Sequence, residues 1–137
     1  MKPTLTPYLI FHGTAKAAMT FYQSILGGQL TMSTYAESGV PSAEEDKNKI
    51  IHADLKNDTL SFMASDDNAK KAVVMGSNVH ISIAGTDEKT ITEYFNKLSE
   101  GGTVDTPLAK QMWGDIFGML TDKFGVHWMV NIGSEQK

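Results

Sequence analysis

Two histidines that stand inside apolar segments are the residues of this sequence with the widest choice of chemistry. His80 lies in "NVHISIAG", where apolar and polar residues alternate as in a strand, and His52 lies in "KIIHADL". An imidazole that titrates near neutral pH can ligate a metal, act as a general base or orient a bound molecule. It can equally be a hydrogen-bonded part of a sheet without a function, so the residues alone leave these alternatives open.

Composition excludes several classes of chemistry and partner. The absence of cysteine from the 137 residues excludes disulfides, thiolate metal sites and cysteine nucleophiles. The net charge is −4 and the twelve basic residues are scattered, so we expect no nucleic-acid partner and a preference for cationic ligands over anionic ones. No apolar run approaches the roughly 20 residues that cross a bilayer, and "MKPTLTPYLIF" lacks the apolar core of a signal peptide. We therefore expect a cytoplasmic protein without a membrane partner.

An internal duplication indicates which elements position the histidines. The segments "PYLIFHGTAKAAMTFYQSILGG" and "ISIAGTDEKTITEYFNKLSEGG" correspond at a constant offset of 74 residues, which places Phe21 on Phe95 and the first Gly-Gly pair on the second. Each copy predicts a strand, a polar turn and an amphipathic helix that ends at the double glycine. Thr14 and Asp87 are the expected N-caps. The expected apolar helix faces are Ala18, Phe21, Tyr22 and Ile25 in the first copy, and Ile91, Tyr94, Phe95 and Leu98 in the second.

Three further extended segments follow each predicted helix. They are "QLTMSTYAE", "KIIHADLKN" and "TLSFMASD" in the first copy, and "TVDTPLAKQMW", "DIFGMLT" and "VHWMVNI" in the second. A tight hairpin turn at Asn57-Asp58 joins two of them. The sequence thus predicts two βαβββ modules, at about residues 1–67 and 78–133, in one domain spanning residues 1–137 with a shared apolar interior.

Paired βαβββ modules with the helix endings "FYQSILGG" and "FNKLSEGG" resemble the vicinal oxygen chelate superfamily, which includes glyoxalase I, bleomycin-resistance proteins and extradiol dioxygenases. The segments "KIIHADL" and "MWGDIFGMLTDKFGVHWMVN" are similar to the PhnB-like branch. The resemblance implies an α+β fold in which the tandem modules form one eight-stranded, curved mixed sheet with a concave cavity. It also implies a homodimer.

Metal-dependent members of this superfamily hold a divalent ion with four ligands, one each from the first and last strands of both modules. The resemblance places these positions at Pro7, near Met63, at His80 and near Met129. Only His80 is a ligand-type residue, and thioether sulfur does not suit the hard or borderline divalent ions used by this superfamily. We therefore expect no metal and no other cofactor.

The remaining side chains of the expected cavity suit an apolar ligand. If His80 faces inward, hairpin pairing places His52 opposite Met63 on the same sheet face. Alternation places Pro7, Leu9 and Phe11 inward from the first strand and His127, Met129 and Asn131 from the last, and Trp113 can form one wall. The candidate ligand-binding residues are His52, His80, Trp113, Met63, Met129 and Phe11.

Structural interpretations of the same residues stay open. His80 could be a relic of a lost metal site, and the two cavity methionines could be core fillers. We expect Trp128 to pack beneath a helix, His12 to be exposed and the acidic run Glu44–Asp46 to be a solvated loop.

The functional hypothesis is a PhnB-like protein that binds a small organic molecule without the usual divalent metal. The alternative is an enzyme, namely a metal-dependent lyase, isomerase or dioxygenase with a non-standard ligand set. A third hypothesis is an interaction protein whose cavity is filled by side chains. A Rossmann-type methyltransferase has no sequence support because no strand-linked G-x-G-x-x-G occurs.

Overall fold

Each half of the chain forms its own four-stranded mixed sheet with one long helix. The structure is a computed structural model that describes residues 2–67 and 73–133. The chain divides into two compact units, Met1–Val74 and Met75–Lys137, which are described separately below as modules one and two. Among the described residues, no helix is long and apolar enough to cross a membrane.

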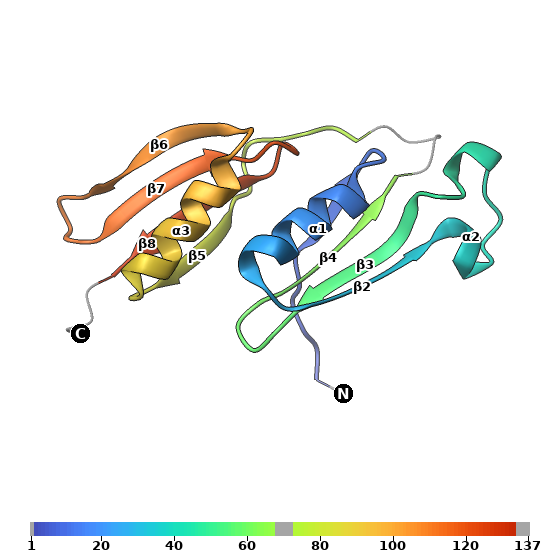
Figure 1. The fold of residues 1–137 in the computed structure, drawn as a ribbon, viewed down its shortest axis with the longest axis horizontal. Coiled ribbons are helices and arrows are strands. Elements are labelled where there is room, and N and C mark those ends of the chain that lie inside the picture. Colours follow the sequence, from blue (N-terminus) through green and yellow to red (C-terminus); the bar gives the residue numbers. More distant parts are fainter. Residues whose placement is uncertain (1, 68–72, 134–137) are drawn as a thin grey trace. The chain divides into compact units, whose positions relative to one another are not determined.

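The elements follow the predicted βαβββ order twice. Module one contains β1 (Tyr8–Phe11), α1 (Ala15–Leu26), β2 (Gln29–Thr34), the short α2 (Tyr35–Ser38), a 3-10 turn (Glu44–Asp46), β3 (Ile50–Lys56) and β4 (Ser61–Asp66). Module two contains β5 (Ile81–Gly85), α3 (Glu88–Ser99), β6 (Thr103–Lys110), β7 (Ile116–Thr121) and β8 (His127–Ile132). The predicted α+β fold class and tandem βαβββ modules are confirmed (Figure 1).

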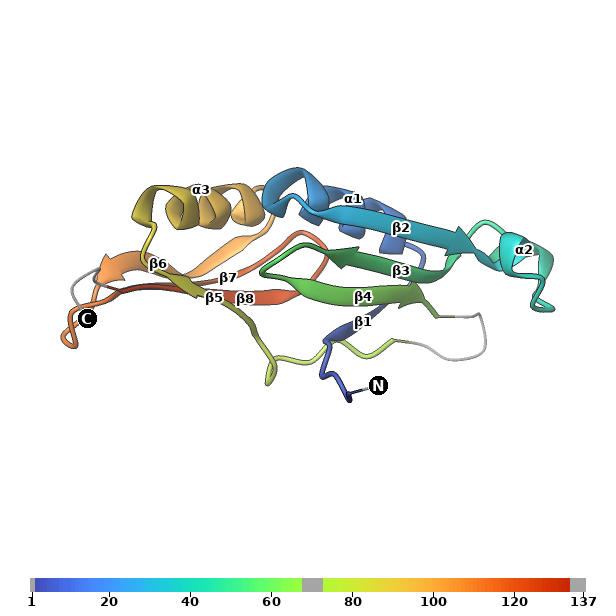
Figure 2. The same cartoon turned by 90° about the horizontal axis from the view of Figure 1, so that it is seen from below.

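The sheet topology is the same in both modules. The strand orders are β1-β4-β3-β2 and β5-β8-β7-β6, so the first and last strands of each module are neighbours. These end strands pair in parallel, whereas the other neighbours pair antiparallel. In each module the long helix covers one face of its own sheet (Figure 2). We call the opposite face of each sheet its distal face.

The core of module one lies between α1 and its sheet. Ala18, Met19 and Tyr22 of the helix are fully buried, and the sheet contributes Leu55 and Phe62 to the same layer. The rings of Tyr22 and Phe62 meet edge to face with their centroids 5.8 Å apart, a favourable geometry for aromatic pairs.

The core of module two is built in the same way. Ile91, Phe95 and Leu98 of α3 are buried, and Trp128 of β8 is only 1% exposed. The absence of a side chain at Gly118 of β7 allows α3 to pack closely on the sheet. A Cβ added there would lie 2.9 Å from the Phe95 ring. The expectation that Trp128 packs beneath a helix is confirmed by its buried position on the face that α3 covers.

The duplication does not keep one offset throughout. The ends of β1 and β5 correspond at 74 residues, since Phe11 O accepts from Asp67 N–H at the point where Gly85 O accepts from Gly133 N–H. The helices correspond at 73 residues, because the loop after β1 is one residue longer than the loop after β5. Buried Tyr22 is therefore the counterpart of buried Phe95, and the expected match of Phe21 to Phe95 is wrong.

The double glycines return the offset to 74 residues. Gly27 and Gly101 both have positive φ, at 74° and 77°, a conformation that glycine adopts without strain at a helix end. One extra residue restores the spacing. Glu100 stands between the end of α3 and its double glycine, whereas Gly27 follows the end of α1 directly.

Two local predictions in module one are wrong for identifiable reasons. Thr14 makes no side-chain capping bond, whereas Asp87 does cap α3 as expected. The strand expected to run through "QLTMSTYAE" ends at Thr34, because Thr34 and Glu37 form a reciprocal capping box that starts α2.

Candidate functional site

The distal face of module one brings an aromatic ring, an imidazole, a carboxylate and a thioether side by side. Strand register aligns Tyr8 of β1 with Met63 of β4, and aligns Met63 with Asp54 of β3. Registered neighbours project to the same side of a sheet, and His52 lies two residues before Asp54 on that side. Tyr8, His52, Asp54 and Met63 therefore share the face opposite α1.

The first strand presents different residues to this face from those expected. Phe11 is 3% exposed and belongs to the core under α1. Tyr8 and Ile10 alternate with it and point the other way, with 46% and 44% of their surfaces exposed. The expectation that Pro7, Leu9 and Phe11 share a face with Met63 is therefore wrong, and Tyr8 takes their place.

Contrary to the sequence prediction, His52 is not aligned with Met63 of the neighbouring strand. The β3–β4 turn contains four residues, Asn57 to Leu60, instead of the expected two, and the Asn57 side chain accepts hydrogen bonds from the backbone N–H groups of Thr59 and Leu60. The longer turn aligns Met63 with Asp54, so the expected pairing of His52 with Met63 is wrong. A two-residue slip conserves the face, and both residues still lie on the distal side.

His52 contacts the residue that the sequence analysis missed. The Tyr8 hydroxyl lies 3.3 Å from His52 Nδ1, and the two rings are 6.0 Å apart and tilted by 45°. The signal for Tyr8 was present in the duplication. The 74-residue offset maps His80 onto Thr6, and thereby places Tyr8 rather than Leu9 on the distal face.

Asp54 is the least satisfied group on this face. Its side chain is 19% exposed, and Oδ1 is buried without a hydrogen-bond partner among the described residues. Its Oδ2 lies 3.9 Å from the Nζ of Lys56, whose side chain is 63% exposed. The carboxylate thus has one weak ionic contact and one unsatisfied oxygen.

The distal face of module two carries two stacked imidazoles. His80 precedes β5, and its ring lies 5.1 Å from that of His127 on β8, with the planes 28° apart. Further along the same face, Ser82 is aligned with Met129, and Met129 with Met119. The expectation that His80, His127 and Met129 share a sheet face is confirmed by this register.

Hydrogen bonds occupy both nitrogens of His127. Its Nε2 lies 3.0 Å from Gly76 O, and its Nδ1 lies 2.8 Å from the Thr121 hydroxyl. That hydroxyl donates to Asp105 Oδ2 at 2.7 Å, so it can only accept from His127.

Trp113 lies in the loop between β6 and β7 and is 59% exposed. Its ring meets that of Phe117 edge to face, with the centroids 6.2 Å apart. Register aligns Phe117 with Asn131, two residues beyond Met129, so Trp113 contacts the aromatic end of the distal face. The structure therefore brings Trp113 to the same face as His80 and Met129.

The side chains on the distal faces do not fit a divalent metal. Among the described residues, no three His, Asp or Glu side chains form a group that could hold a metal ion. Both nitrogens of His127 are engaged, and His80 Nε2 lies 3.2 Å from the carbonyl oxygen of Ser77. Of the ring nitrogens of His80 and His127, only the buried His80 Nδ1 is free of a hydrogen bond among the described residues, and one imidazole nitrogen is too few for the superfamily's chemistry.

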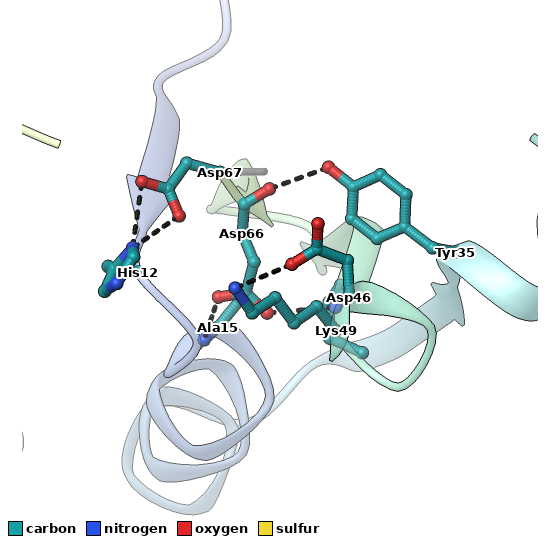
Figure 3. Close-up of polar contacts among 8 residues, drawn as sticks. His12, Ala15, Tyr35, Asp46, Lys49, Asp66 and Asp67 are labelled. Carbon is teal, nitrogen blue, oxygen red and sulfur yellow. Dashed lines mark hydrogen bonds and ion pairs between the residues drawn. The ribbon is translucent and has the colours of Figure 1, made fainter. Parts of the chain in front are cut away.

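A second polar cluster in module one surrounds the carboxylate of Asp66 (Figure 3). Its Oδ1 accepts from the N–H of Ala15 at the start of α1, and its Oδ2 accepts from the N–H of Ile50 at the start of β3, both at 2.9 Å. Its backbone oxygen accepts from the Tyr35 hydroxyl at 3.0 Å. Asp66 is 3% exposed and every one of these contacts is structural, so it replaces Thr14 as the group that satisfies the helix N-terminus.

Other acidic residues extend this cluster to the surface. Asp46 is 3% exposed and pairs with Lys49 at 2.9 Å, so the expectation that Glu44–Asp46 is a solvated loop is wrong for its last residue. Burial and the nearby carboxylates raise the pKa of Tyr35, and the hydrogen bond to Asp46 raises the pKa of Lys49. His12 is exposed as expected and pairs with Asp67 at 2.8 Å.

Comparison with known proteins identifies similar chains over nearly the full length. Residues 3–131 match the family described as 3-demethylubiquinone-9 3-methyltransferase. Protein PA1353 from Pseudomonas aeruginosa is 35% identical, with a TM-score of 0.86 over 98% of this chain and 100% of that chain. The PhnB protein from Bacillus cereus is 28% identical, with a TM-score of 0.80 over 96% of this chain and 100% of that chain.

A more distant structure is similar in fold alone. A glyoxalase/bleomycin resistance protein/dioxygenase from Nocardioides is 18% identical, with a TM-score of 0.62 over 100% of this chain and 87% of that chain. It shares the paired modular architecture described above.

Replacing Asp66 with asparagine tests the structural role of its cluster. An amide has one acceptor oxygen where the carboxylate has two, so Asp66→Asn leaves one buried backbone N–H facing an NH₂ group. Because an unsatisfied buried donor costs about 1–3 kcal/mol, we expect the free energy of unfolding in urea to fall by about that amount. Asp58→Asn, in the exposed β3–β4 turn, is the matched control and should have the stability of the wild type. Equal stability of the two variants would contradict the assignment.

Proposed function

The chain belongs to the 3-demethylubiquinone-9 3-methyltransferase family, a PhnB-like branch of the glyoxalase/bleomycin-resistance superfamily, and from this membership we propose that it binds a small organic molecule without the superfamily's usual divalent metal. The proposed binding surfaces are the distal faces of its two sheets. The candidate residues are Tyr8, His52 and Met63 in module one, and His80, Met129 and Trp113 in module two.

The observation that carries this proposal is the mixture of side chains gathered on each distal face. Ligand sites are mostly apolar and aromatic, with a few polar groups that fix orientation. Module one offers the ring of Tyr8 and the thioether of Met63 around His52. Module two offers Met129 beside the stacked imidazoles and the Trp113–Phe117 pair at one end. Phe11, which was expected to contribute, belongs to the helix-covered core and takes no part in this proposal.

The half-buried state of these side chains supports a binding role over simple core filling. Met63, Met129, His52 and His80 retain partial exposure, unlike the fully buried residues under α1 and α3. Apolar area of this kind supplies affinity when a ligand removes it from water, at about 25 cal/mol per Å². Imidazole nitrogens supply the few directional contacts.

The metal-dependent enzyme remains the alternative function, and the donor geometry opposes it. Both nitrogens of His127 are occupied by protein acceptors, and His80 offers one free nitrogen. A Lewis-acid role would need a group of ligands that the described residues do not assemble. Binding without a resident metal requires no such group.

We further infer that the protein acts in the cytoplasm as a homodimer, with no nucleic-acid or membrane partner. Each sheet ends in two edge strands, and the exposed Tyr8 and Ile10 lie on one of them. Light scattering should then give a mass of about twice 15.0 kDa; a mass of one chain would contradict the dimer.

Ligand binding should raise the thermal stability of the protein. A molecule selective for the folded state stabilises it by about 2.7 kcal/mol at a concentration of 100 times its Kd. In a thermal-shift screen of small aromatic and cationic metabolites, we expect at least one compound to raise the melting temperature. The shift should shrink in Met63→Ala or Met129→Ala, because each variant removes contact area from one distal face.

The control for this screen is Lys16→Ala, on the exposed side of α1, which should respond to the compound as the wild type does. A shift that persists unchanged in both methionine variants would place the ligand elsewhere. A screen without any stabilising compound would favour the interaction-protein hypothesis.

Elemental analysis tests the metal-free part of the proposal. Protein purified without chelators should contain no stoichiometric transition metal, and manganese, nickel or zinc titrated into it should bind equally to the wild type and to His80→Ala. Stoichiometric metal that is lost in His80→Ala would overturn this part of the proposal and favour the enzyme.

A further inference from the structure

Two buried side-chain atoms on the distal faces have no hydrogen-bond partner among the described residues. They are Asp54 Oδ1 in module one and His80 Nδ1 in module two. Both lie where we propose that the ligand binds.

Of the two, Asp54 has the larger need for a partner because it is an anion. A buried polar atom without a partner lowers stability, and an unpartnered charged group lowers it more. Lys56 offsets little of this cost, since its Nζ is 3.9 Å from the other carboxylate oxygen and its side chain is mostly in water. The fold therefore maintains an anionic group that its own residues do not satisfy.

Apart from the weakly paired Lys56, the register neighbours of Asp54 on the distal face are not cationic. Register places Met63 on one side of Asp54 and Thr31 on the other. Tyr8 lies beside Met63, with its hydroxyl directed to His52 Nδ1. These groups offer an aromatic ring and a thioether, which suit the apolar part of a ligand and, for the ring, an adjacent positive charge.

We propose that Asp54 is the recognition group for the protonated nitrogen of an organic amine, bound on the distal face of module one. This inference rests on the proposed function and names the ligand class of the same surface. An ammonium group that reaches the exposed part of the Asp54 side chain donates a charge-assisted hydrogen bond to the carboxylate and compensates its charge, which a neutral hydroxyl does not. The carbon skeleton of the amine then lies over Met63 and Tyr8. The net charge of −4 favours the same class of ligand.

The test compares amines with alcohols of the same skeleton. Phenethylamine and tryptamine are titrated into ¹⁵N-labelled full-length protein, in parallel with 2-phenylethanol and tryptophol. Ammonium chloride at equal concentration is the salt control. We expect the amines to shift the backbone amides of Thr31, Asp54 and Met63, with a Kd at least tenfold lower than that of each matched alcohol. Ammonium chloride should leave these amides unchanged.

The Asp54→Asn variant assigns the preference to this carboxylate. It conserves size but removes the charge, so we expect the amines to lose about tenfold or more in affinity, the usual effect of losing a charged hydrogen bond. Asp58→Asn, four residues away in the exposed turn, should bind amines as the wild type does. The unfolding free energy of Asp54→Asn should equal or exceed that of the wild type, because an unpaired buried charge is removed.

Each contrary result has a distinct meaning. Equal binding of amines and alcohols, equal amine binding by Asp54→Asn, or equal shifts with ammonium chloride would overturn the inference and leave the proposed binding function intact. Absence of binding by all four organic probes at millimolar concentration would overturn the inference and would also count against the proposed function. A marked loss of stability in Asp54→Asn would make the carboxylate structural and overturn the inference as well.

Discussion

Both modules depend on the parallel pairing of their first and last strands. This pairing joins β1 to β4 and β5 to β8, and so closes each βαβββ unit with its helix across one face. Its register decides which side chains lie under the helix and which lie on the distal face. Tyr8 lies beside Met63, and His80 stacks on His127, because of the register between these parallel strands. A shift of one residue would exchange the core and the candidate site.

Buried aspartates secure this arrangement by satisfying backbone and side-chain donors. Asp66 is the last residue of β4, and its carboxylate accepts from the N–H groups of Ala15 at the start of α1 and Ile50 at the start of β3. In module two, Asp122 accepts from the N–H groups of Phe124 and Val126, and from Nε1 of the buried Trp128. Each carboxylate loses its hydrogen bonds to water on burial but accepts hydrogen bonds from several protein donors. These bonds offset the cost of removing the carboxylate from water. The two anchors differ in sequence position, so the modules share topology without sharing every stabilising contact.

Sequence reasoning recovered the elements and topology because apolar periodicity and double glycines are local signals. It placed His80 and Met129 on one face, as found, but assigned the wrong face to Phe11. The error arose because the resemblance places the first-strand position at Pro7, whereas the 74-residue offset of the strands maps His80 onto Thr6. The β3–β4 register depended on how the Asn57 side chain folds the turn. Such one-residue differences leave composition and periodicity unchanged, and only tertiary contacts reveal them.

The contrast between Asp66 and Asp54 separates a structural carboxylate from the one that we propose binds a ligand. Both are acidic residues on adjacent strands of one sheet, and both have buried oxygens. Asp66 is fully bonded on the helix side, where an unsatisfied group would weaken the core. Asp54 is incompletely bonded on the distal side, where its Oδ1 has no hydrogen-bond partner among the described residues. Strained and unsatisfied groups concentrate at functional sites. By this reasoning, the unsatisfied carboxylate of Asp54 favours the distal face of module one as the surface for the proposed ligand.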